Sequence, residues 1–465
     1  IDQATNPTIS ACSSVMRMDT TPPVAATTLT WNEISPHDNT AITNSWIVSV
    51  DGDVASQRIT YYTDALCTTP EGTNTVLTAT ANADSFTGTD SNTYYFSITT
   101  TDVANNSSVS LCSPAMAVDT SAPNAVTGLN WTQTSPHAAN SIDANWTLST
   151  SLDIQNYEVQ FYTDNLCTTT VGAVNTVGNT ITTQNYLGTD ATEYFYIVTA
   201  VDNADNRTNS TCSPGLTVDT TFPPAALGMS WLETSPSSVT GVTASWTLST
   251  ASDIASQVMT YYNDAACSGA VDSTAPLSGI AVTSNFSGVD ATNYYFTIQT
   301  IDNAGNATTS TCSSIMSIDT TAPAAPTVIA WAETSPHNAL NITSSWTVSA
   351  AGDIANQRIT YFTDALCTVA TGLPQLVGSG VNNNVFTGTD GVQYNFTVAA
   401  IDNAGNETTS ICSATMTVDV TAPNSATTLA WAEGSAANVS PVNPTWVIST
   451  STDRASQIID LYQST

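Results

Sequence analysis

Nine cysteines recur in two series, and within each series the spacing is 100 residues. One series consists of Cys12, Cys112, Cys212, Cys312 and Cys412, and the other of Cys67, Cys167, Cys267 and Cys367. So regular a pattern is typical of disulfides formed in an oxidising compartment. A metal site is the alternative, but no two cysteines lie close in sequence and no histidine shares their period. The cysteines therefore predict a secreted or cell-surface protein.

Two disulfide pairings fit this spacing. Cys67 can bond Cys112 within one repeat, or Cys12 across a junction, at separations of 45 and 55 residues. We favour the bond within the repeat, because each repeat would then fold as a self-contained domain with its own disulfide. The favoured pairs are Cys67 with Cys112, Cys167 with Cys212, Cys267 with Cys312, and Cys367 with Cys412.

Charge excludes several classes of function. The chain has 465 residues, and its 5 cations, all arginines, face 38 Asp and Glu residues for a net charge of −33. Such a chain cannot neutralise a phosphate backbone or bind an anionic membrane surface. Without lysine it has neither a P-loop nor a Schiff-base site. No apolar run approaches the roughly 20 residues that span a bilayer, and no signal peptide opens the sequence.

Catalysis finds no support in the histidines. His37, His137 and His337 recur in Ser-Pro-His turns, but the equivalent residues of two other repeats are Ser237 and Ala437. A position that changes chemistry between copies is typical of a surface turn, and no nucleophile is paired with a base. The sequence predicts a protein that is not an enzyme.

The elements that position these residues repeat with the same period. Asp19, Trp31 and Trp46 recur at intervals of 100 residues without insertion or deletion, which defines four complete units at 19–118, 119–218, 219–318 and 319–418. Residues 1–18 correspond to the C-terminal end of a preceding repeat, and residues 419–465 to the N-terminal part of a fifth. We expect the chain to be a window on a longer repetitive protein.

Hydrophobic residues alternate with a period of two. Tyr94, Phe96, Ile98 and Thr100 share one face of a predicted strand, and the other units repeat the pattern. No segment shows a convincing 3.6-residue stripe. Short strands, turn residues and about 100 residues per unit predict all-β, antiparallel sandwiches.

Specific strings resemble bacterial fibronectin type III and related Ig-like tandem repeats of surface proteins and adhesins. They include residues 246–249 (WTLS), 288–296 (GVDATNYYF), 301–306 (IDNAGN) and the junction 319–323 (DTTAP). The resemblance implies strands A to G, with C′ near Cys67, a single G strand over 107–118 and a tyrosine corner at Tyr94. If C′ and G lay at opposite edges of one sheet, Cys67 and Cys112 would be too far apart to bond, which would favour junction or inter-chain disulfides.

The resemblance also brings recurring aspartates together at the junctions between repeats. The first junction would gather Asp64 and Asp90 with Asp119, Asp153 and Asp202, and several carboxylates around one linker suit Ca²⁺. Similar adhesin repeats use calcium for rigidity, although no cofactor is required. The alternative is that each aspartate caps a turn. The predicted set is Asp64, Asp90, Asp119, Asp153, Asp202, Asp219, Asp253, Asp302, Asp319, Asp353 and Asp402.

Glycosylation sequons recur at the predicted FG turn, at Asn106, Asn206, Asn306 and Asn406. Their common register predicts surface glycosylation, with turn chemistry as the alternative.

The function predicted from these features is structural. Tandem sandwiches arranged as an extended rod would form a stalk, fibre, filament shaft or adhesin on a prokaryotic cell, in contact with other copies of the chain. A carbohydrate- or protein-binding array, with a cell-surface or glycan ligand, is the alternative. A non-catalytic spacer of a larger secreted enzyme is another.

Overall fold

The computed structural model describes residues 3, 5, 7, 9–434 and 441–462. The chain divides into two compact units, Ile1–Phe222 with Asn303–Asn306, and Pro223–Asp302 with Ala307–Thr465. All regular secondary structure in the described residues is β-strand. The same residues contain no helix with the length and apolar character needed to cross a membrane.

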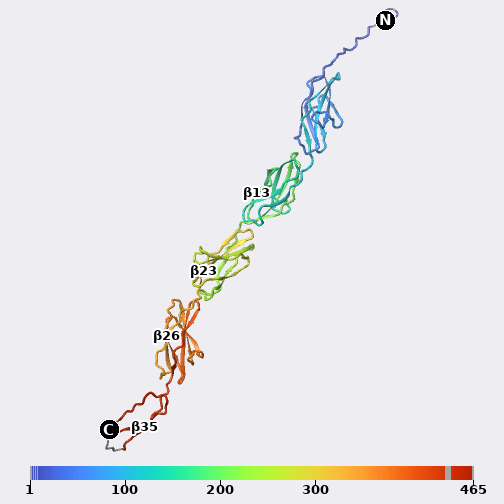
Figure 1. The fold of residues 1–465 in the computed structure, drawn as a ribbon. Helices are drawn as coiled ribbons and strands as arrows, with labels where there is room; N and C mark the ends of the chain where they lie inside the picture. Colours follow the sequence, from blue (N-terminus) through green and yellow to red (C-terminus); the bar gives the residue numbers. More distant parts are fainter. Residues whose placement is uncertain (1–2, 4, 6, 8, 435–440, 463–465) are drawn as a thin grey trace. The chain divides into compact units, whose positions relative to one another are not determined.

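Each complete repeat forms two antiparallel sheets (Figure 1). In repeat 1 the order of the smaller sheet is β1-β2-β5, and that of the larger sheet is β4-β3-β6-β7, with β8 also pairing β6. Repeat 1 contains β1 (Thr27–Trp31), β2 (Ala41–Ile47), β3 (Val54–Tyr62), β4 (Thr75–Thr78), β5 (Ala83–Thr87), β6 (Asn92–Asp102), β7 (Ser107–Val109) and β8 (Met116–Val118).

The later repeats keep this arrangement. Repeat 2 contains β9 (Thr127–Trp131), β10 (Ser141–Thr147), β11 (Ile154–Tyr162), β12 (Thr170–Gly178), β13 (Thr183–Leu187), β14 (Thr192–Asp202), β15 (Arg207–Asn209) and β16 (Leu216–Val218). Repeat 3 contains β17 (Leu227–Trp231), β18 (Gly241–Thr247), β19 (Ile254–Tyr262), β20 (Ala270–Ser273), β21 (Leu277–Ser278), β22 (Thr283–Ser287), β23 (Thr292–Asp302), β24 (Ala307–Thr309) and β25 (Met316–Ile318).

Repeat 4 contains β26 (Thr327–Trp331), β27 (Asn341–Thr347), β28 (Ile354–Phe362), β29 (Ala370–Gly378), β30 (Asn383–Thr387), β31 (Gln393–Asp402), β32 (Glu407–Thr409) and β33 (Met416–Thr417). Residues 419–462 contribute β34 (Thr427–Trp431) and β35 (Pro444–Val447). The prediction of all-β tandem sandwiches is confirmed.

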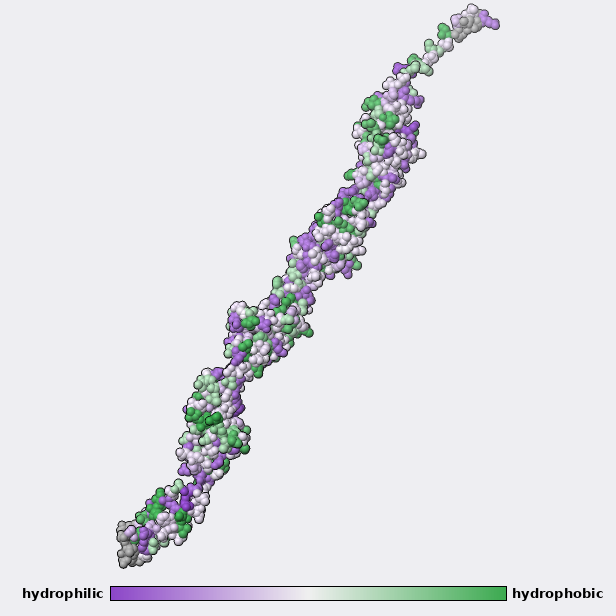
Figure 2. Space-filling view, viewed as in Figure 1, coloured by the Kyte–Doolittle hydropathy of each residue, from purple (hydrophilic) through white to green (hydrophobic). Residues whose placement is uncertain are grey.

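The core of each sandwich comes from the alternating strands. In repeat 1, Ile59 on β3 and Phe96 and Ile98 on β6 are fully buried, facing Trp46 of the other sheet. Phe86 stacks on Tyr61 with ring centroids 4.2 Å apart. Aromatic rings bury large areas, so a few of them close a sandwich of this size. In the view of Figure 2, the surface of each complete sandwich carries both hydrophilic and hydrophobic residues.

A tyrosine corner occurs in each complete repeat, as the resemblance implied. The Tyr94 hydroxyl accepts a hydrogen bond from the backbone N–H of Thr89 at 2.9 Å, and Tyr94 is buried. A Cβ at the adjacent Gly88 would lie 2.8 Å from the Tyr94 ring. Glycine is therefore required at this turn.

The expectation of one continuous strand G is wrong. Strand G is split into β7 and β8 because Ser110 and Ser113 replace the ladder between them. Their hydroxyls accept hydrogen bonds from the backbone N–H groups of Ile98 and Phe96, at 2.9 and 3.0 Å. Strand C′ is β4, well beyond Cys67, so its predicted position near Cys67 is also wrong.

Candidate functional site

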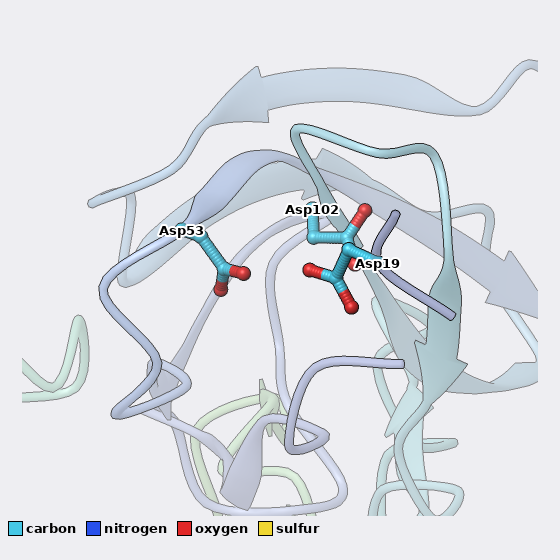
Figure 3. A group of neighbouring side chains, drawn as sticks. All are labelled: Asp19, Asp53 and Asp102. Atoms are coloured by element: carbon cyan, nitrogen blue, oxygen red, sulfur yellow. The ribbon is translucent and has the colours of Figure 1, made fainter. Parts of the chain in front are cut away.

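Three aspartates meet where the linker after repeat 1 enters repeat 2. Asp119 lies in the linker, Asp153 directly precedes β11, and Asp202 ends β14; one carboxylate oxygen from each lies within 4.8 Å of the others. Asp19, Asp53 and Asp102 form the same arrangement at the start of repeat 1, with their carboxylates gathered below the strand ends (Figure 3). Asp319, Asp353 and Asp402 do so in repeat 4.

The remaining predicted set is divided between the two compact units. Asp219 belongs to the first unit, and Asp253 and Asp302 belong to the second.

Asp202 is held rigidly by its own turn. It is fully buried, and its carboxylate accepts hydrogen bonds from the backbone N–H groups of Ala204 and Asn206 and from the Asn206 amide, at 2.8, 2.9 and 3.0 Å. A buried carboxylate needs such partners. Asp202 therefore presents its charge to the linker from a fixed position.

Burial and the neighbouring carboxylates both affect the pKa of Asp119. Desolvation by burial raises the pKa of Asp119, and repulsion from Asp202, Asp153 and Asp90 raises that pKa further. Three carboxylates this close repel one another, so the group favours either a proton or a cation. The oxygen donors suit a hard cation such as Ca²⁺.

The carboxylate of Asp90 holds the linker to the preceding repeat. It accepts hydrogen bonds from the Thr120 N–H and the Ser121 hydroxyl, both at 2.6 Å. These bonds lower the pKa of Asp90 to about 2. Asp190, Asp290 and Asp390 make the equivalent bonds in the other repeats. Asp90 is not among the three carboxylates whose oxygens lie within 4.8 Å of one another, so its predicted place in the junction set is wrong.

The side-chain amide of Asn206 holds the same linker to the following repeat. It donates a hydrogen bond to the backbone carbonyl of Asp119 at 2.8 Å as well as to Asp202. Asn106 donates to Asp19 at 3.1 Å, and Asn406 donates to Asp319 at 2.7 Å. The linker is thus held from both sides.

This geometry argues against the predicted glycosylation. The nitrogens that would carry the glycan at Asn106, Asn206 and Asn406 are the donors of these bonds, and Asn306 is buried. A glycan would displace the linker. The recurring Asn is explained by turn and linker chemistry, which was the alternative.

Asp64 does not join the junction. Its carboxylate accepts hydrogen bonds from the backbone N–H groups of Leu66, Thr68 and Thr69 in its own turn. Desolvation raises its pKa, but the bonds from Thr69 and Thr68 outweigh that effect and lower the pKa to about 2. The assignment of Asp64 to the junction is wrong, because the residue caps the turn that carries Cys67.

All four disulfides join cysteines of one repeat. They are Cys67–Cys112, Cys167–Cys212, Cys267–Cys312 and Cys367–Cys412, with Cα atoms 5.8 to 6.0 Å apart. The bond is feasible because Cys67 lies in the turn at the end of β3, rather than on the edge strand, and Cys112 lies between β7 and β8. Cys12 is free and exposed. Four disulfides are typical of an oxidising, extracellular compartment.

The sequence does not indicate a backbone bridge that lies near the linker. The N–H of His37 donates to the carbonyl of Ala117, and the N–H of Asp119 donates to the carbonyl of His37, both at 2.9 Å. The two segments run parallel. The backbone of Ser237 makes the same bonds in repeat 3, so the histidine imidazole is not needed for them. The residue type at this position therefore does not indicate the bridge.

No family model matches the chain. No curated protein matches it either. Among solved structures, the FN1–FN3 domains of chicken CNTN1 match at 13% identity and a TM-score of 0.31, over 63% of this chain and 98% of that chain. The strand pairing of this chain itself defines its fold.

Proposed function

We propose that the chain is the shaft of an extracellular stalk, fibre or adhesin on a prokaryotic cell. The observation that carries this proposal is the linker held from both sides, by Asp90 of one repeat and Asn206 of the next. A linker fixed to both neighbours transmits orientation along the chain, which a flexible tether does not. High negative charge keeps such a rod soluble and discourages random association.

Small-angle X-ray scattering of the full chain tests the rigidity of the shaft. We expect a maximum dimension that fits extended, ordered repeats. Replacing Asn206 and Asn406 by alanine should shorten the average dimension, because the linkers after repeats 1 and 3 lose one of their two anchors. Asn209→Ala, outside the linker, is the matched control. A wild-type profile of freely jointed beads would contradict the proposal.

Immunogold electron microscopy of the producing cells tests location. Antibodies against the chain should label surface stalks or fibres, and label confined to the cell interior would exclude this function.

Calcium is part of the same proposal. The donors at Asp119, Asp153 and Asp202 fit the oxygen preference of Ca²⁺, and a bound ion would relieve the repulsion among them. Calorimetric titration with CaCl₂ should show binding that Asp153→Asn and Asp353→Asn together reduce. Asp205→Asn, an exposed change in the turn that follows Asp202, should leave binding unchanged. Absence of binding by the wild-type chain would remove calcium from the proposal.

A second candidate function, glycan binding, is favoured by outward-facing tyrosines. Tyr62 and Tyr95 are opposite each other on β3 and β6, on the face away from the core, and both are partly exposed. The Tyr62 hydroxyl bonds to Ser97 at 3.1 Å, so the ring lies across the sheet. Tyr262 and Thr297 repeat this contact at 3.3 Å. Rings held in this way can stack on a neutral sugar, whereas the net charge repels acidic glycans.

Binding to insoluble cellulose and chitin tests the second candidate. Tyr62→Ala with Tyr262→Ala should abolish retention on whichever polysaccharide retains the wild-type chain. Phe362 occupies the equivalent position in repeat 4, where its partner on the neighbouring strand is the buried Asn395. Phe362→Ala is therefore the control. Equal retention of all three chains would reject the tyrosine site.

A further inference from the structure

The last strand of each complete repeat is joined to an early loop by the parallel bridge described above. In repeat 1 it consists of the two backbone bonds at His37 and a third bond, at 2.9 Å, from the Ala117 N–H to the Ser35 hydroxyl. The equivalent serines are Ser135, Ser235 and Ser335.

Tension along the chain loads this bridge in shear, because its two segments are parallel. It pulls the early segment toward the N-terminus and the last strand toward the C-terminus. Because the two segments are parallel, that pull slides one along the other and loads the three bonds together, rather than one after another. The bridge therefore resists extension at the C-terminal end of the repeat, while the pairing of β1 with β2 resists it at the N-terminal end.

The disulfide lies in the path that tension follows after the bridge has broken. Cys67 follows β3 and Cys112 precedes β8, with a sequence separation of 45 residues. Strands β4 to β7 all fall inside the loop that the disulfide closes. Once β1 to β3 and β8 have been pulled out, tension passes through the sulfur atoms and bypasses the loop.

We infer that each complete repeat is an extension-limited element, in which the parallel bridge sets the opening force and the disulfide sets the released length. Subtracting the 45-residue loop from the 100-residue period leaves 55 residues to extend. At about 3.5 Å per residue this is about 190 Å per repeat, against about 350 Å without the disulfide. The inference deepens the proposed shaft function, but it rests only on strand topology and disulfide pairing.

Single-molecule force spectroscopy of the full chain tests the inference. Cys12→Ser is present in every sample to prevent pairing between chains, and the molecule is held by handles at its two ends. The wild-type repeats should open in up to four steps. A chain in which the eight paired cysteines are serines should open in steps longer by about 160 Å, the length of the 45-residue loop at about 3.5 Å per residue.

A second measurement covers the case in which the serine variant does not fold. The oxidised chain is opened under force, and dithiothreitol is then added. Its two thiols become a cyclic disulfide while the protein disulfide becomes two thiols, so electrons and protons balance. Each reduction should release a further step of about 160 Å. Opened wild-type repeats that lengthen in full 100-residue steps before reduction, or that show no further step after it, would overturn the inference.

The bridge has its own test. Replacing Ser35, Ser135, Ser235 and Ser335 by alanine should lower the opening force without changing the step length. Thr415→Ala, next to β33 but outside the bridge, is the control and should change neither. An unchanged opening force in the serine variant would remove the bridge from the inference. Neither result depends on where the protein resides, so failure here is distinct from failure of the immunogold experiment.

Discussion

Repeat 2 closes its core differently from the other three complete repeats. In repeats 1, 3 and 4 the side-chain oxygen of a buried glutamine accepts a hydrogen bond from a buried tryptophan, as at Gln57 and Trp46, 2.9 Å apart. In repeat 2 the position is Tyr157, and the Trp146 indole N–H has no hydrogen-bond partner among the described residues. The tryptophan of repeat 2 is therefore held by its apolar packing without the hydrogen bond that the other three repeats make.

The difference extends to the turn that follows the edge strand. The Gln57 amide donates to the carbonyls of Ala79 and Ala81, at 3.0 and 2.8 Å, and so holds that turn against β3. Tyr157 cannot do this, and in repeat 2 the Asn179 amide reaches back to the Ile154 carbonyl at 2.9 Å. In repeat 2 the turn itself thus supplies the hydrogen bond that a core glutamine supplies elsewhere.

The largest expected effect should be the same in both kinds of core. Replacing Cys167 and Cys212 by serine, or Cys267 and Cys312 by serine, opens a 45-residue loop and should cost about 4 kcal/mol of repeat stability by loop entropy. Hydrogen exchange of β11 and β19, followed by mass spectrometry, measures the two losses. A loss confined to one repeat would mean that the two cores differ in more than the glutamine.

Removing the glutamine should separate the two cores. Gln357→Leu leaves the Trp346 indole N–H and the carbonyls of Ser379 and Val381 without their partner, and should destabilise repeat 4 by about 3 kcal/mol. Tyr157→Phe loses only the bond from the Ser149 N–H and should cost about 1 kcal/mol. Hydrogen exchange of β28 and β11 measures the two losses of stability. Equal losses would contradict the difference between the glutamine core and the tyrosine core.

A smaller difference is expected at the tryptophans. Both Trp146→Phe and Trp346→Phe shrink a ring, but only the second leaves a buried glutamine oxygen unpaired. Trp346→Phe should therefore cost about 1 to 2 kcal/mol more than Trp146→Phe. If the two substitutions have the same effect on exchange, the Trp–Gln bond contributes nothing net.

Acid should act on the linkers and leave the core difference unchanged, since glutamine does not titrate. The pKa of Asp90 is lowered by its bonds to Ser121 and Thr120, so its hold on the linker is complete above pH 4 and is lost as the pH falls through about 2. Carbon NMR of the Asp90 carboxyl should show this midpoint. A normal midpoint near 4 would mean that the carboxylate does not hold the linker in solution.

The fold and part of the site were predictable from the sequence because the repeats align without gaps. The sandwich implied by the resemblance placed Asp119, Asp153 and Asp202 around one linker, and alternation placed Phe96 in the core. Local geometry was not predictable: Asp64 is one of many turn aspartates, and only coordinates reveal that its oxygens are engaged. The bridge at His37 is made by backbone atoms, so no residue type in the sequence indicates it.

Two ion pairs on the outer face of the larger sheet are reversed between repeats. In repeat 2, Glu158 pairs with Arg207, and in repeat 4, Arg358 pairs with Glu407 at the equivalent positions. A β11 strand that took the place of β28 during folding would bring Glu158 against Glu407, two like charges. Tandem domains of similar sequence are prone to exchange strands as they fold. The reversed charges therefore disfavour an exchange of these two strands between repeats 2 and 4.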